Sequence, residues 1–82
     1  MDEPMHSFLA KRSDRAQRLY ISALNQLRAA VGRYLQEGTP AARQAMADRL
    51  ETAREREQAW TNAVNAWIEW GRDRRDDWEP IQ

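Results

Sequence analysis

The side chains in this sequence that could support acid–base, metal or phosphate chemistry are few and scattered. The single histidine, His6, lies near the N-terminus, with no cysteine, second histidine or suitably spaced carboxylate to share a metal ion. The sequence has no glycine-rich loop for phosphate and no serine in a nucleophile-elbow context. Glu57 with Arg15 or Arg18 is the only constellation that could converge in a helical bundle. We therefore expect no catalytic residue, cofactor or metal, and a protein that is not an enzyme.

A group of basic side chains near the N-terminus could contact phosphates. Lys11, Arg15 and Arg18 share one helical face, and Arg12 lies beside them. A dimer would double this basic surface, and Asp14 offsets only part of its charge. The whole chain has thirteen basic and thirteen acidic residues, so no overall field attracts nucleic acid. RNA or DNA binding through this face is therefore the alternative function.

Tryptophan and arginine come together near the C-terminus, in the segment WIEWGRDRRDDW. These two residue types are enriched among the hot spots of protein interfaces. Aspartates alternate with the arginines and cancel most of their charge, which suits a protein partner better than a nucleic acid. The segment predicts a partner-binding surface formed by Trp70, Arg72, Arg74, Arg75 and Trp78.

The element that must position these groups is a pair of helices joined by a tight turn. Gly38, Thr39 and Pro40 follow one another in the sequence. Glycine suits the left-handed residue just after a helix, threonine suits the N-cap of the next helix, and proline suits its first turn. A connection this short makes the two helices antiparallel neighbours. The predicted fold is all-α, an antiparallel two-helix hairpin with helices at about residues 5–37 and 40–78.

Large apolar residues recur at alternating spacings of four and three along both predicted helices, which indicates a seam between them. Glu57 interrupts the seam of the second helix. Its carboxylate either reaches water at the edge of the seam or is buried near Tyr20 and a flanking arginine. The predicted core and dimer-contact residues are Tyr20, Leu24, Leu27, Val31, Leu50, Trp60, Val64 and Trp67.

Each helix carries more apolar surface than one neighbouring helix can cover. Beside the seam of the second helix lies a flank of small and aromatic residues that includes Ala59, Ala63 and Trp70. An exposed apolar patch of this kind marks an interface. We therefore expect a homodimer that forms a four-helix bundle, with the hairpins packed through their alanine-rich and tryptophan-rich flanks.

The 82 residues predict a single domain, 1–82, in which residues 71–82 form a charged tail if Gly71 ends the second helix. No run is apolar enough to span a bilayer, and we expect a cytoplasmic protein without membrane contacts. The predominance of arginine over lysine suggests a high-GC bacterial or phage gene. The predicted function is a non-enzymatic protein–protein interaction module. It would act as a regulator, adaptor or inhibitor of an unidentified protein, for example as a phage- or mobile-element-encoded inhibitor of a host protein.

Overall fold

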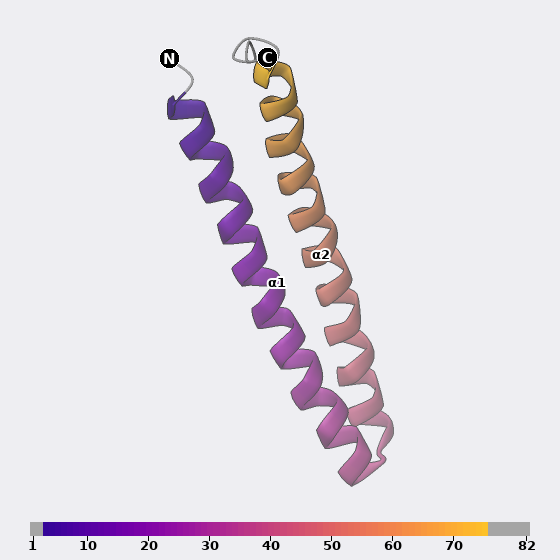
Figure 1. The fold of residues 1–82 in the computed structure, drawn as a ribbon. Coiled ribbons are helices and arrows are strands. Elements are labelled where there is room, and N and C mark those ends of the chain that lie inside the picture. The colour runs from indigo at the N-terminus through magenta and orange to yellow at the C-terminus, as the bar shows by residue number, and fades with distance from the viewer. Residues whose placement is uncertain (1–2, 76–82) are drawn as a thin grey trace.

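The computed structural model describes residues 3–75, which form two long helices in antiparallel contact (Figure 1). Helix α1 spans Glu3–Glu37 and helix α2 spans Pro40–Arg75. The Cα atoms extend over 61 × 22 × 15 Å, so the hairpin is a single layer of two helices. The predicted all-α hairpin is confirmed, and the second helix continues through Gly71.

The turn is built as the order of its residues predicts. Gly38 adopts a φ of 61°, and its N–H donates to the carbonyl of Tyr34 at 2.8 Å, which closes the C-terminus of α1. The Thr39 hydroxyl then accepts from the N–H of Ala42 at 3.1 Å, an N-cap bond that satisfies one of the free donors of α2. Pro40 fills the first helical position, where no N–H is needed.

Small residues occupy the centre of the seam between the helices. Ala23, Ala42, Ala53 and Ala63 are 6%, 0%, 4% and 1% exposed, and Leu9 is the one large apolar side chain that falls in the buried class among the described residues. Alanine lets two helix backbones approach closely. The larger side chains then lie along the edges of the contact, where neither helix covers them completely.

The predicted core and dimer-contact residues divide into two groups within the hairpin. Tyr20, Leu27, Val31, Trp60, Val64 and Trp67 are half-buried, as residues at the edge of a seam are. Leu24 and Leu50 instead remain 36% and 39% exposed within the hairpin. The sequence spacing is compatible with either placement, because the alanines and the leucines follow the same four-and-three periodicity on adjacent stripes of each helix.

The open end of the hairpin, opposite the turn, is held by aromatic contacts. The His6 ring lies 5.6 Å from the Trp67 ring in an edge-on arrangement and 5.6 Å from the Trp70 ring. From the sequence alone, the position of His6 near the N-terminus does not predict these ring contacts. Contacts of this type across two helices stabilise the first turns of α1 and the last turns of α2 together.

Candidate protein-interaction surface

One broad side of the hairpin is formed by small and basic residues, and we call it the alanine–arginine face. Two shallow hollows of about 280 Å³ each run along it between the helices. The first is lined by Gln26, Ala29, Ala30, Arg33, Ala45 and Arg49. The second is lined by Arg12, Arg15, Ala16, Leu19, Ala59, Asn62 and Ala63. Arg49 donates from Nη1 to Oε1 of Gln26 at 2.7 Å and so links the two helices across this face.

The opposite broad side is formed by branched aliphatic residues. Four of these side chains each follow a residue of the alanine–arginine face by five positions, namely Leu24, Val31, Leu50 and Val64. Five positions correspond to a rotation of about 140° around a helix. These four side chains therefore lie across the seam from the hollows, on the other side of the hairpin.

Further apolar side chains extend these two stripes by steps of three or four residues, the spacing of neighbours on one helical face. We call the whole surface the aliphatic face, and it consists of Ile21, Leu24, Val31, Leu35, Met46, Leu50, Val64 and Ile68. Ile21, Leu35 and Ile68 are 48%, 77% and 51% exposed. Of the eight exposed large apolar side chains among the described residues, five lie on this face. The others, Met5, Phe8 and Leu19, lie elsewhere.

The aliphatic face also contains a shallow hollow and charged residues of both signs, among them Arg54 and Glu57. The hollow measures about 210 Å³ and is lined by Trp60, Thr61, Val64 and Asn65. Arg54 and Glu57 lie beside it, both exposed, and neither has an ion-pair partner within the described part of the chain. The exposure of Glu57 agrees with the expectation that its carboxylate reaches water.

The predicted partner-binding residues lie at the open end of α2. Trp70 is half-buried, with its ring against His6, so part of its surface already stabilises the hairpin. Arg72 is exposed on the last turns of the helix. The helical backbone includes Arg74 and Arg75, whose side chains lie outside the described residues, as does the whole of Trp78.

The predicted nucleic-acid face is exposed near the middle of α1. Phe8, Lys11, Arg12 and Arg15 line a common hollow of about 350 Å³. Arg18 forms an ion pair with Asp14, with 2.9 Å between Nη2 and Oδ2. The pairing reduces the positive charge that Arg18 offers to a phosphate. The structure therefore brings Lys11, Arg12 and Arg15 together and gives Arg18 an acidic neighbour.

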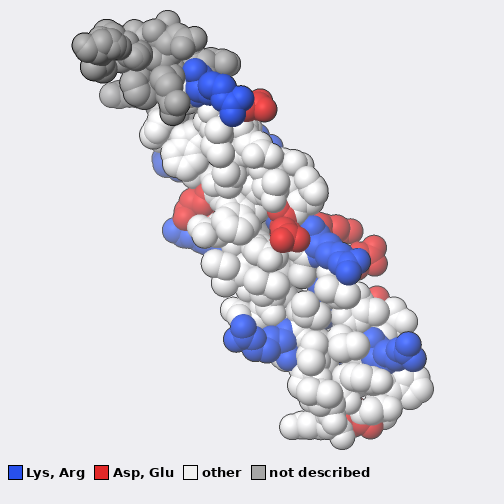
Figure 2. Space-filling model, turned by 45° about the vertical axis from the view of Figure 1, so that its right-hand side comes forward, with Lys and Arg blue, Asp and Glu red and all other residues white. Residues whose placement is uncertain are grey.

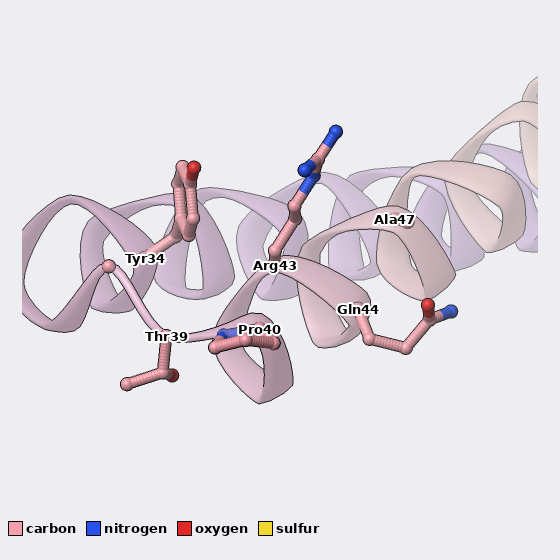
Figure 3. Close-up of a pocket in the computed structure, with 7 residues that line it drawn as sticks. Tyr34, Thr39, Pro40, Arg43, Gln44 and Ala47 are labelled. Carbon is pink, nitrogen blue, oxygen red and sulfur yellow. The ribbon is translucent and has the colours of Figure 1, made fainter.

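A hollow of about 530 Å³ lies at the turn (Figure 3). Tyr34 and Arg43 project from the two helices in the same direction, whereas Gln44 projects away from them. The lining of this hollow contains no carboxylate, histidine or cysteine. Among the residues whose side chains the structure describes, no group of three or more metal-binding side chains occurs.

The charges are distributed in small mixed groups. Figure 2 shows basic and acidic side chains interspersed with broad areas of uncharged surface. A surface of this kind favours contact with another protein over long-range attraction of a polyanion. In the described part of the chain, neither helix is long and apolar enough to cross a membrane.

No protein-family model, no curated protein and no solved structure matches this chain.

Proposed function

We propose that this protein is a non-enzymatic helical interaction module that self-associates as a homodimer and binds a protein partner through the open end of α2. In this role it acts as a regulator, adaptor or inhibitor by occupying a surface of its partner. The observation that carries the proposal is the poor burial of the isolated hairpin. Among the described residues no large side chain is fully buried, while eight large apolar side chains are exposed.

A two-helix hairpin with a centre of alanines has little hydrophobic stabilisation of its own. Removal of apolar surface from water contributes about 25 cal/mol per Å², and each alanine offers little such surface. Small domains bury a smaller fraction of their surface than large ones, and this chain has no cysteine that could add a disulfide. Association covers the exposed aliphatic residues and supplies the missing area.

The open end is the region proposed to meet a different protein. Arg72 is exposed, Trp70 keeps part of its ring accessible, and three further arginine or tryptophan residues follow in the sequence. Tryptophan and arginine supply large contact areas and several hydrogen-bond donors, which is why they dominate interface energetics.

The test of partner binding uses charge reversal at the open end, because this leaves the helix–helix seam intact. The variant replaces Arg72, Arg74 and Arg75 with Glu, and its control reverses Arg15, Arg33 and Arg56, three exposed arginines outside the open end and the aliphatic face. A nuclease-treated lysate from a high-GC bacterium is passed over each immobilised protein. The proposal expects a discrete protein that the wild type and the control retain and the variant loses. Equal retention by all three proteins would contradict it.

RNA or DNA binding is the second candidate, and the hollow shared by Phe8, Lys11, Arg12 and Arg15 favours it. An aromatic ring beside three cations can stack on a base while the cations contact phosphates. Binding of a labelled oligonucleotide should then weaken steeply with salt, with a slope of about −0.7 to −0.9 per phosphate contact in a double-logarithmic plot. Replacing Lys11 and Arg15 with Ala should reduce the slope, whereas replacing Arg28 should not. A flat salt response would eliminate this candidate.

A further inference from the structure

We infer that the aliphatic face is the dimer interface, and that a second copy of this chain docks on it in one antiparallel arrangement. This inference rests on the proposed self-association and goes beyond it by choosing the face and the register. The choice differs from a dimer packed through the alanine-rich flank. That flank carries arginine-lined hollows, whereas the aliphatic face carries five of the exposed large apolar side chains.

The area of the face fits a stable dimer. Each helix contains at least 35 residues, which gives a length of about 50 Å, and two helices side by side are about 20 Å wide. Two such faces in full contact bury on the order of 2,000 Å² in total, above the threshold of about 1,000 Å² for a specific interface. If the two faces overlapped only in part, much less area would be buried. The two-fold axis should therefore cross the hairpin near its middle.

The contacts between the helices show where the middle lies. Tyr20 and Trp60 have their rings 5.5 Å apart, and Arg49 bonds Gln26, so these parts of α1 and α2 lie side by side. The middle of the hairpin is therefore near Tyr20 on α1 and near Glu57 on α2, and the opposite charges of Arg54 and Glu57 select the level between these two residues. We place the axis at this level, in the plane of the interface and perpendicular to the helices, so that α2 lies antiparallel to the partner's α2.

This axis pairs complementary features of α2. It brings Arg54 beside the partner's Glu57, and by symmetry Glu57 beside the partner's Arg54. Leu50 and Thr61 are equidistant from the axis, so Leu50 enters the partner's hollow between Trp60, Thr61 and Val64. A side chain that enters a hole on the facing helix is the packing found in helical bundles.

The other two-fold axis, parallel to the helices, lacks these matches. It would set α2 against the partner's α1 and bring Glu57 close to the partner's Gln17 and Ile21. The carboxylate would then lose water without gaining a cation, which is costly at an interface. Charge complementarity therefore favours the perpendicular axis.

Cysteine cross-linking tests this arrangement directly, because the chain contains no cysteine of its own. Positions 50 and 61 are about 16 Å apart along one helix, too far for a disulfide within the chain. In the proposed dimer, position 50 of one chain lies opposite position 61 of the other chain. The variant Leu50→Cys with Thr61→Cys should form a covalent dimer on oxidation, whereas either single variant should keep the 9.6 kDa mass of the chain under denaturing conditions.

Charge exchange supplies an independent measurement that does not depend on oxidation. Glu57→Arg alone and Arg54→Glu alone should each raise the dimer Kd about tenfold or more, because each creates two like-charge contacts in the dimer. The variant with both substitutions should recover most of the affinity. Glu51→Arg changes the net charge equally on another side of α2 and should leave the Kd within about threefold of the wild type.

The outcomes separate failure of the register, of the face and of dimerisation. Cross-linking of Leu50→Cys alone would place the axis at Leu50 and overturn the register. If the wild type is a dimer, and Leu19→Cys forms a covalent dimer while Leu50→Cys with Thr61→Cys does not, the choice of face is wrong and self-association stands. A wild-type mass that stays at that of one chain across a hundredfold concentration range would overturn the proposed self-association itself.

Discussion

The two broad faces of the hairpin are made by the same two helices but differ in what they expose. On the alanine–arginine face, alanines form the floor of two hollows, and Arg49 crosses between the helices to bond Gln26. On the aliphatic face, Leu24 and Leu50 stand 36% and 39% exposed without a covering neighbour. Among the described residues, Leu19 is the one exposed large apolar side chain of the first face, whereas the second face has five.

The difference between the faces follows from the alanine seam. When small residues occupy the centre of a helix pair, the backbones approach closely and larger residues are displaced to the edges. Here the displaced leucines, isoleucines and valines gather on one side. A hairpin built in this way is stabilised by its seam, and it gains further stability only through contacts with another molecule.

The strongest test of the comparison puts a charge on each face at equal exposure. Leu50 is 39% exposed and Leu19, on the alanine–arginine face, is 41% exposed, so exposure alone predicts equal effects. We expect Leu50→Asp to destabilise the dimer by about 3 kcal/mol or more, because the dimer then loses the burial of two leucine surfaces and must bury two unpaired carboxylates. Leu19→Asp should stay within about 1 kcal/mol of the wild type. Thermal unfolding at several protein concentrations measures both, and equal losses would remove the distinction between the faces.

A second test adds bulk instead of charge. Ala53 is 4% exposed in the seam, so Ala53→Leu should overpack the helix contact and cost about 1 to 3 kcal/mol. Ala59 is exposed on the alanine–arginine face, and Ala59→Leu should change the free energy of unfolding by less than about 0.5 kcal/mol. Urea unfolding compares the two variants. Loss of the dimer in Ala59→Leu would identify the alanine–arginine face as an interface.

The turn fixes which residues belong to each face, and its glycine should be sensitive to substitution. Gly38 has a φ of 61°, so Gly38→Ala should cost about 1 to 2 kcal/mol. Gly71 lies within α2, and a Cβ there would meet nothing within 4 Å. Gly71→Ala should therefore stabilise the protein by about 0.5 to 1 kcal/mol. The two thermal midpoints should move in opposite directions, and a shared direction would contradict the turn geometry.

The aromatic contacts of the open end should make a small contribution to stability. His6→Ala removes a ring that lies 5.6 Å from both Trp67 and Trp70, and we expect a loss of about 0.5 to 1.5 kcal/mol. Ser7→Ala, at the exposed neighbouring position, is the matched control and should have almost no effect. Hydrogen exchange of the last two turns of α2 measures the local change. Unaltered protection in His6→Ala would mean that these contacts do not hold the two ends together.

The sequence alone determined the helices and the turn. Gly38, Thr39 and Pro40 are local signals, each of which acts within one or two residues of its own backbone, so their order predicted where α1 ends and α2 begins. The periodic apolar residues predicted that the helices pack together, because their spacing depends only on the geometry of one helix. The continuation of α2 through Gly71 was left open, since a glycine weakens a helix by an amount that distant contacts can offset.

Only the tertiary structure decided which periodic stripe occupies the centre of the seam. Ala23 and Leu24 are adjacent in sequence, as are Ala63 and Val64, and either stripe satisfies the same spacing. The choice depends on how closely two helices can approach, a property of the pair that neither helix carries alone. The same packing set His6 against Trp67 and left Leu50 exposed, and it thereby separated a face with few exposed large apolar side chains from one that has several and remains open to a second molecule.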